Sequence, residues 1–231
     1  MRRYVTEFIG TALFVLTIGL VVISAHPLAP LAIGCALMVL VYMGWHVSGA
    51  HYNPAVSLAA MMRGALPRGD LLPYWGAQIL GAVTGAVLAR ILTGETFSPS
   101  PGVGVSMFVA FLAEALYTFA LALVVLNVAV SRKTAGNSYF GLAIGFTIVI
   151  AAFAAGGISG GAFNPAVGTG PIVVHALLGS GGFDSLLLYW VGPLAGGALA
   201  AVVFGYQERQ PAVSDVPPIE GKPGAPPPIP R

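Results

Sequence analysis

Two nearly identical stretches of the sequence contain the polar residues best placed to act on a solute. Residues 48–56 read Ser-Gly-Ala-His-Tyr-Asn-Pro-Ala-Val, residues 159–167 read Ser-Gly-Gly-Ala-Phe-Asn-Pro-Ala-Val, and six of the nine positions are identical. Asn is favoured as a helix N-cap and Pro in the first helical turn, so each stretch predicts a helix that begins at Pro54 or Pro165. One copy alone would fit an ordinary capped surface helix. Two matched copies, each beside a long apolar segment, predict a paired site.

The chemistry of such a site follows from the start of a helix. The first turn has unpaired backbone N–H groups and about half a positive charge, so two such ends repel cations. Asn53 and Asn164 can bind backbone through their amide oxygens while their N–H groups turn toward a passing solute. Segments 49–52 and 160–163 are expected to present carbonyl oxygens along the same path. These groups favour uncharged solutes that form hydrogen bonds.

The composition places this site in a membrane. The chain has 231 residues, of which 57% are hydrophobic and 8% charged, and its mean hydropathy is +0.87. Soluble domains have about 25% charged residues, so the lipid bilayer is the expected solvent. A net charge of +2 gives no reason to expect a nucleic-acid partner. The single cysteine, Cys35, excludes an internal disulfide and a cysteine metal cluster, and no metal site, cofactor or catalytic cluster is predicted.

Apolar segments and turns predict an all-α membrane protein. Six segments are long enough to span a bilayer, at 4–25, 31–48, 71–93, 105–130, 139–157 and 185–206. The helices that follow the two Asn-Pro-Ala stretches, at 54–63 and 165–177, are too short to span it at about 1.5 Å per residue. Residues 207–231 hold eight prolines in 25 positions and are expected to be a disordered tail.

The second half of the chain repeats the first. Glu7 corresponds to Glu114 and Asn53 to Asn164, which divides residues 1–206 into one repeat at 4–94 and another at 105–206. Each repeat has three spans and one half-helix. Because three is odd, the second repeat must be inverted, with the half-helices meeting near the bilayer midplane.

The positive charges predict the orientation. If the N-terminus is cytoplasmic, nine of the ten Lys and Arg residues lie on the cytoplasmic side, and only Arg90 lies outside. Positive residues are enriched in cytoplasmic loops. Both termini are therefore expected in the cytoplasm. The nine residues are Arg2, Arg3, Arg63, Arg68, Arg132, Lys133, Arg209, Lys222 and Arg231.

The paired motifs, over residues 4–206, resemble the aquaporin or major intrinsic protein family. The resemblance implies six tilted helices and two half-helices that form a channel for small neutral solutes, and usually a homotetramer. It implies no enzyme activity. In the family, glutamates at the positions of Glu7 and Glu114 hold the half-helix loops by hydrogen bonds, and His46 matches a position near the first loop. The alternative is a secondary transporter in which Glu7 and Glu114 relay protons.

The resemblance also assigns pore residues. The motifs give Asn53, Pro54, Ala55, Asn164, Pro165 and Ala166, and the loops give Ala50, His51, Tyr52, Ala162 and Phe163. A four-residue constriction near the outer mouth falls by spacing on Ile33, Ala152, Gly161 and Val167.

Val167 departs from the family pattern, because family members usually have arginine at this position. The constriction is therefore expected to be wide, apolar and uncharged, as in some bacterial aquaglyceroporin-like members of the inner membrane. Such a mouth suits water and larger neutral solutes: glycerol, urea, hydrogen peroxide, or metalloid species such as arsenite and methylated arsenicals.

Overall fold

The computed structural model describes residues 1–209, and these are helical throughout apart from turns and loops. The long helices are α1 (Arg2–Ile23), α2 (Ala29–Ser48), α4 (Leu71–Thr93), α5 (Met107–Val125), α6 (Phe140–Ser159) and α8 (Leu186–Arg209). The short ones are α3 (Pro54–Met62) and α7 (Pro165–Leu178), with the single turns η1 (Arg68–Asp70), η2 (Leu126–Val130) and η3 (Arg132–Thr134).

The six spans predicted from the sequence are confirmed. Within the described residues, six helices are long and apolar enough to cross a bilayer, and each corresponds to a predicted segment. Many large apolar side chains on these helices point outward, among them Leu72, Leu80, Phe108 and Val202. A membrane supplies the apolar surroundings that such a surface needs, so the chain is a multi-pass membrane protein.

One boundary of the predicted tail is wrong. Residues 207–209 continue α8 to Arg209, because this stretch still follows the helix without a proline or glycine to end it. The rest of the predicted tail, residues 210–231, lies outside the described residues. The predicted fourth span, 105–130, corresponds to the observed span Met107–Val130, in which α5 ends at Val125 and residues 126–130 form a π-helical turn.

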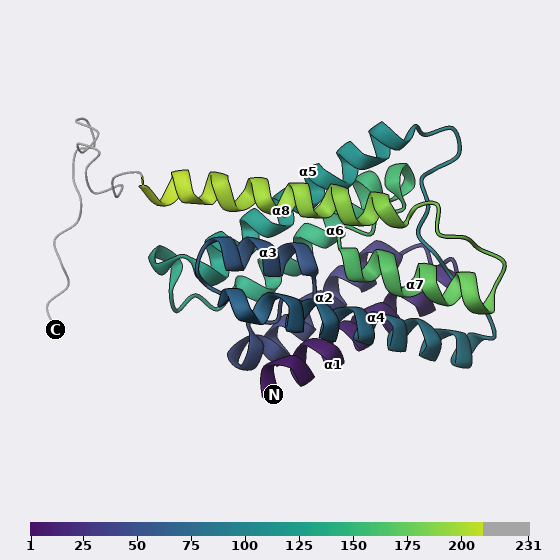
Figure 1. Cartoon of the computed structure of the whole chain (residues 1–231), viewed down its shortest axis with the longest axis horizontal. Helices are drawn as coiled ribbons and strands as arrows, with labels where there is room; N and C mark the ends of the chain where they lie inside the picture. Colours follow the sequence, from purple (N-terminus) through teal and green to yellow (C-terminus); the bar gives the residue numbers. More distant parts are fainter. Residues whose placement is uncertain (210–231) are drawn as a thin grey trace, which may run out of the picture.

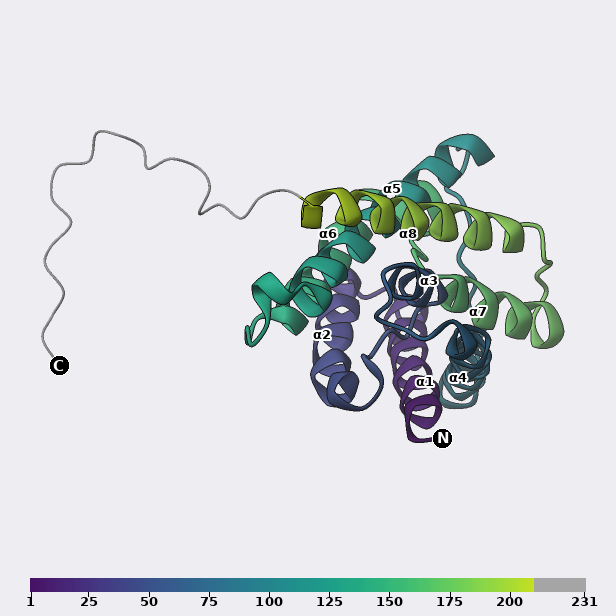
Figure 2. The same cartoon turned by 60° about the vertical axis from the view of Figure 1, so that its left-hand side comes forward.

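The two short helices lie between α4 and α8 (Figure 2). Helix α1 packs along α4 in the first half of the chain and α5 along α8 in the second, while α2 and α6 pack against each other and join the halves. Glycines allow the closest approaches. A Cβ on Gly81 of α4 would collide with the carbonyl oxygen of Phe8, and one on Gly196 of α8 with that of Ala115. Backbones at this distance contact each other directly, as small residues permit in membrane helices.

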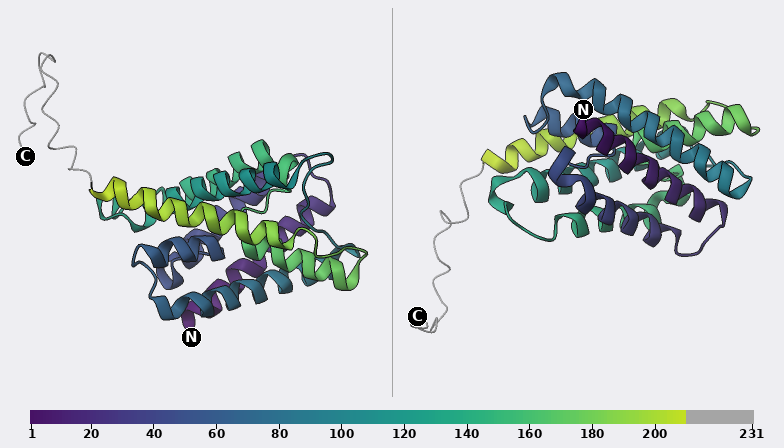
Figure 3. Two further views of the ribbon diagram at one scale, coloured as in Figure 1. Left: turned by 45° about the horizontal axis from the view of Figure 1, so that its top comes forward. Right: turned by 90° about the horizontal axis from the view of Figure 1, so that it is seen from below.

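Helices α3 and α7 reach inward from opposite ends of the molecule, roughly in line with each other (Figures 1 and 3). One end, called here the N-terminal face, carries the start of α1 and the ends of α3, α5 and α8. There the Arg3 guanidinium binds the Asp70 carboxylate at 2.8 Å. The other end, called the loop face, carries the α1–α2 turn and the α4–α5 loop. This arrangement brings the first residues of α3 and α7 together in the interior.

Candidate functional site

The two asparagines of the Asn-Pro-Ala stretches begin the short helices, as predicted. Both have extended backbone, with φ of −155° at Asn53 and −164° at Asn164, as N-cap residues do. The Asn53 Oδ1 accepts the backbone N–H of Ala55 at 2.9 Å, and the Asn164 Oδ1 accepts that of Ala166 at 2.9 Å. Each amide oxygen is thus held on its own helix.

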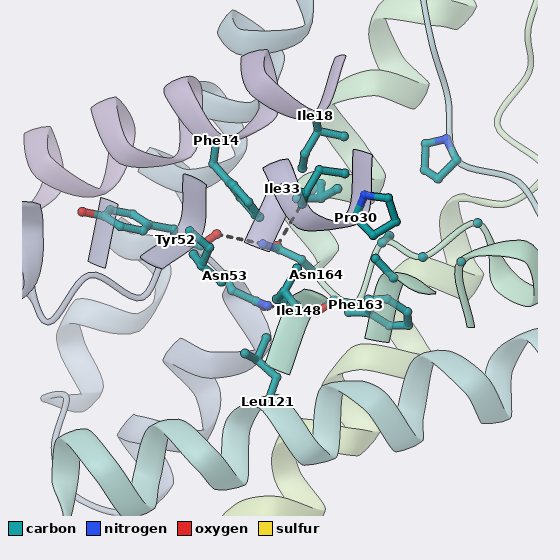
Figure 4. Close-up of a pocket in the computed structure, with 18 of the residues that line it drawn as sticks. Phe14, Ile18, Pro30, Ile33, Tyr52, Asn53, Leu121, Ile148, Phe163 and Asn164 are labelled. Carbon is teal, nitrogen blue, oxygen red and sulfur yellow. Dashed lines mark hydrogen bonds between the residues drawn. The ribbon is translucent and has the colours of Figure 1, made fainter. Parts of the chain in front are cut away.

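The amide nitrogens reach across to the other half of the chain (Figure 4). Asn53 Nδ2 donates to the Phe163 carbonyl at 2.9 Å, and Asn164 Nδ2 donates to the Tyr52 carbonyl at 2.8 Å. An amide nitrogen carries two hydrogens, so each retains one beyond this bond. The two helix starts are therefore joined and fixed in orientation.

The loops before the asparagines have a strained backbone. Ala50 and Tyr52 have φ of +47°, and Phe163 has φ of +48°, where residues with a side chain cost about 1–2 kcal/mol. Gly49 and Gly160, at φ of +84° and +90°, end α2 and α6 in the left-handed region that glycine adopts readily. Such backbone persists only where its surroundings fix it.

Glu7 of α1 fixes the first loop. Its Oε1 accepts the Ser48 hydroxyl at 2.7 Å and the His51 N–H at 2.9 Å. Its Oε2 accepts the Tyr52 N–H at 2.7 Å and an Nε2 hydrogen of Gln78 at 2.8 Å. The side chain is fully buried. Glu7 therefore accepts hydrogen bonds from the loop N–H groups of His51 and Tyr52, which have no partner within a helix.

Glu114 of α5 does the same for the second loop. Its Oε1 accepts the Ser159 hydroxyl at 2.7 Å and the Ala162 N–H at 3.0 Å, and its Oε2 accepts the Phe163 N–H at 2.6 Å. It too is fully buried, and neither glutamate is among the residues that line the central cavity described below. Their contacts are those of loop-supporting residues.

His46 does not fulfil the loop-supporting role expected of it. Its side chain is exposed on α2, and no hydrogen bond to it is present among residues 1–209. His51 is the histidine that contacts the interior: its Nδ1 lies 3.1 Å from the Ser57 hydroxyl, and its ring packs against Tyr74.

Two tyrosines that the sequence analysis missed also hold the loops. The Tyr74 hydroxyl donates to the Ser48 carbonyl at 2.8 Å, and the Tyr189 hydroxyl donates to the Ser159 carbonyl at 2.6 Å. Both tyrosines are fully buried. Each thus binds the last carbonyl before its loop leaves the helix.

The tryptophans that follow these tyrosines hold the short helices. Trp75 Nε1 donates to the Pro54 carbonyl at 3.0 Å. Trp190 Nε1 donates to the Thr169 hydroxyl at 2.9 Å, which in turn donates to the Pro165 carbonyl at 2.7 Å. The repeated Tyr-Trp pair, in matching positions of the two halves, was the signal in the sequence that could have revealed them.

A cavity of about 350 Å³ passes the paired asparagines. Its wall includes all four residues assigned to the constriction, Ile33, Ala152, Gly161 and Val167. It also includes both asparagines and the five loop residues named from the sequence, Ala50, His51, Tyr52, Ala162 and Phe163. The prolines and alanines of the motifs, Pro54, Ala55, Pro165 and Ala166, are buried behind the wall and do not line it.

The remaining wall is mostly apolar. Aliphatic and aromatic side chains face the asparagines from the long helices, as Figure 4 shows for Phe14, Ile18, Leu121 and Ile148. In the described part of the chain, the residues that line the cavity include no Asp, Glu, Lys or Arg. Residues 1–209 also contain no group of three His, Cys, Asp or Glu side chains that could hold a metal ion.

Comparison with known proteins identifies the architecture. The chain is 36% identical over 221 residues to the probable aquaporin TIP2-2 of Oryza sativa subsp. japonica, covering 89% of this chain and 87% of the relative. It is 37% identical over 212 residues to aquaporin-8 of Notomys alexis, covering 86% and 79%. The structure of the aquaglyceroporin from Plasmodium falciparum superposes with a TM-score of 0.78 and 23% identity over 90% of this chain and 95% of that one, which shows the same fold.

The comparisons also distinguish between a channel, a secondary transporter and an enzyme. Nothing in these similarities supports a proton-coupled secondary transporter, and the relatives are channels rather than enzymes. Residues 1–204 match the model of the Major intrinsic protein family. The chain belongs to this family, and it is a membrane channel and not an enzyme.

Proposed function

We propose that the chain conducts small uncharged solutes passively through the central cavity, and that its constriction admits solutes larger than water. Candidate solutes are water, glycerol, urea, hydrogen peroxide and neutral metalloid species such as arsenite and methylated arsenicals. Two of the similar proteins are named as aquaporins and a third as an aquaglyceroporin, which supports water and polyols as the first solutes to test.

The observation that carries the proposal is the composition of the constriction. Val167 is 5% exposed and lies on the cavity wall with Ile33, Ala152 and Gly161. An arginine at position 167 would add a long, charged side chain with five N–H donors. Valine leaves that volume open and uncharged. The passage is thus wider than an arginine would leave it, and the four constriction side chains offer no hydrogen-bonding group.

Selection against cations comes from the two helix starts. Helices α3 and α7 direct their N-termini toward the same part of the cavity, and each N-terminus carries about half a positive charge. No acidic side chain among the described lining residues offsets this charge. A cation that lost its water would meet the partial positive charge of both helix starts in a mostly apolar passage, whereas a neutral solute would lose far less hydration energy.

The polar path along one wall suits solutes with hydroxyl or amide groups. Asn53 and Asn164 each have one amide hydrogen left for a solute, and the loop carbonyls lie beside them. The opposite wall of apolar side chains can pack against the carbon atoms of a polyol. The polar groups of a polyol can thus bind one wall while its carbon atoms pack against the other.

We also propose that the N-terminal face is cytoplasmic, that the membrane is an inner membrane, and that the channel is a homotetramer. The orientation is supported by the cations of the described segments at the N-terminal face, which are Arg2, Arg3, Arg63, Arg68, Arg132 and Lys133. Arg90, near the end of α4, lies toward the loop face. Positive residues concentrate on the cytoplasmic side of membrane proteins.

The test is a panel of solutes on purified protein in liposomes, followed by stopped-flow light scattering. Ala152→Trp should block every solute, because Ala152 lines the cavity at the constriction. Ala154→Trp is the matched control, since Ala154 is exposed on the same helix and does not line the cavity. We expect native and Ala154→Trp vesicles to pass water and at least one larger neutral solute. Native flux equal to that of empty vesicles, or undiminished flux in Ala152→Trp, would refute the proposal.

A further inference from the structure

The side chain of Tyr52 leaves the cavity and fills a slot between α1 and α2. Tyr52 directly precedes Asn53, its side chain is fully buried, and its ring points away from the paired asparagines (Figure 4). Its backbone, at φ of +47°, is in the left-handed region that residues with a side chain avoid. Something in the surroundings must hold it there.

Two glycines form the slot. A Cβ on Gly10 of α1 would collide with the Tyr52 ring, and a Cβ on Gly44 of α2 would collide with its hydroxyl oxygen. Any side chain at either position would therefore displace the ring. Neither glycine is at a turn, so their small size is explained by the room that Tyr52 requires.

At the end of the slot the Tyr52 hydroxyl donates to the Leu40 carbonyl at 3.0 Å. This carbonyl is inside α2, where it also accepts the N–H of Gly44 in the usual helical pattern. The hydroxyl thus adds a bond to an acceptor that already has one. Removal of the Tyr52 hydroxyl would therefore leave the Leu40 carbonyl with its helical hydrogen bond, and no buried acceptor would be unsatisfied.

The second repeat has no such slot. Tyr117 stands where the first repeat has Gly10, Ala155 stands where it has Gly44, and Phe163 takes the place of Tyr52. Phe163 has no hydroxyl and packs against the ring of Tyr117 at a centroid distance of 5.7 Å. The anchor on α2 is therefore specific to the first loop.

Tyr52 connects this anchor to the centre of the cavity. Its N–H donates to Glu7 at 2.7 Å, and its carbonyl accepts the Asn164 amide at 2.8 Å. One residue thus joins α1, α2 and the start of α7. A shift of the ring in its slot moves the carbonyl that orients Asn164.

We propose that Tyr52 is a positioning residue for conduction: its hydroxyl anchors the first loop to α2, and this anchor sets the width of the passage and the orientation of the Asn164 amide. The inference rests on the proposed function, because it needs a conducting cavity. If the ring is pushed out of the slot, the loop moves toward the cavity and narrows it. Larger solutes are then lost before water.

The test is a double-mutant cycle of Tyr52→Phe and Gly44→Ala, with the ratio of glycerol to water permeability as the readout. This ratio is independent of the amount of folded protein, so a loss of stability alone does not change it. We expect it to fall about threefold in Tyr52→Phe and about tenfold in Gly44→Ala, where the new methyl group displaces the hydroxyl. The double variant should come close to Tyr52→Phe alone, since the colliding hydroxyl is gone and the new methyl group then meets only the Thr6 side chain and the end of the ring.

Tyr42→Phe is the matched control. Tyr42 is also on α2, and its hydroxyl also donates to a backbone carbonyl, that of Ser138 at 3.0 Å, but it does not line the cavity. Its ratio should equal that of the native chain. If Gly44→Ala fails to fold, the ratio in Tyr52→Phe, which adds no atom to the slot, decides the proposal, and an unchanged ratio counts against it.

The outcomes separate the two proposals. If native vesicles conduct, two results would overturn the role of Tyr52 and leave the channel function intact. One is an unchanged ratio of glycerol to water permeability in Tyr52→Phe. The other is an effect of Gly44→Ala on this ratio that is the same with Tyr52 and with Phe at position 52. Native vesicles that conduct no solute would overturn the proposed function, and the role of Tyr52 with it.

Discussion

Asn53 and Asn164 bind reciprocally across the cavity, each donating to the carbonyl of the residue that precedes the other. The two bonds measure 2.9 and 2.8 Å, and both asparagines are nearly fully buried. Since each amide oxygen is already held by the first turn of its own helix, neither side chain can flip without losing both bonds. The pair is locked with its free hydrogens available to a solute.

Asn53→Asp and Asn164→Asp should weaken the exclusion of cations. Aspartate cannot donate across the cavity, and its negative charge opposes the partial positive charge of the helix start. We expect the proton leak of proteoliposomes to rise about tenfold or more in either variant. The measurement is the decay of a pH gradient with a trapped dye, with Asn137→Asp, in a loop outside the cavity, as the control. Native-like leak in folded Asp variants would remove the asparagines from the selection of solutes.

Glu7→Gln and Glu114→Gln should destabilise the fold without changing how flux depends on pH. A glutamine presents one amide N–H₂ group where the carboxylate accepts, and this group would face the N–H of Tyr52 or Phe163. A buried donor left without its acceptor costs about 1–3 kcal/mol. The measurement is the thermal unfolding temperature of the purified variants. A pH-dependence of flux that is altered in a stable variant would instead indicate a proton relay.

Gly81→Ala should reduce the yield of folded protein, because its Cβ would collide with the backbone of α1 at Phe8. Gly76→Ala is the control on the same helix, since a Cβ there would meet nothing within 4 Å. Alanine exceeds glycine in helix propensity by about 1 kcal/mol, so the control should be neutral or slightly stabilising. Size-exclusion chromatography after heating compares them. Equal yields would show that α1 and α4 can separate to admit the methyl group.

The sequence was sufficient for the architecture because each element has a local cause. Apolar length predicts the spans, and Asn-Pro predicts the starts of α3 and α7. The correspondence of Glu7 with Glu114 reveals the repeat, and the odd number of spans in each repeat predicts the inversion. The observed bounds differ from the predicted ones by only a few residues, as at the end of α8.

Features that depend on contacts between distant segments could not be read in the same way. His46 was expected to support the first loop because of the family resemblance, but its side chain is exposed on α2. Tyr74 and Tyr189 reach the loops from the next long helix, which is evident only once the helices are packed. The slot for Tyr52 requires Gly10 and Gly44, whose importance lies in the absence of a side chain.

Val167→Arg tests the central claim, that an apolar constriction without arginine makes this a wide channel for neutral solutes. The guanidinium would narrow the passage, add fixed donors that suit water, and place a positive charge in an apolar wall. Val167→Met is the matched control, because it adds length without charge or donors. The measurement is the ratio of glycerol to water permeability in liposomes with equal amounts of folded protein. We predict that the ratio falls at least about tenfold in Val167→Arg, with water flux retained, and much less in Val167→Met. A ratio in Val167→Arg equal to that of the native chain would contradict the account, because Val167 would then not be at the constriction.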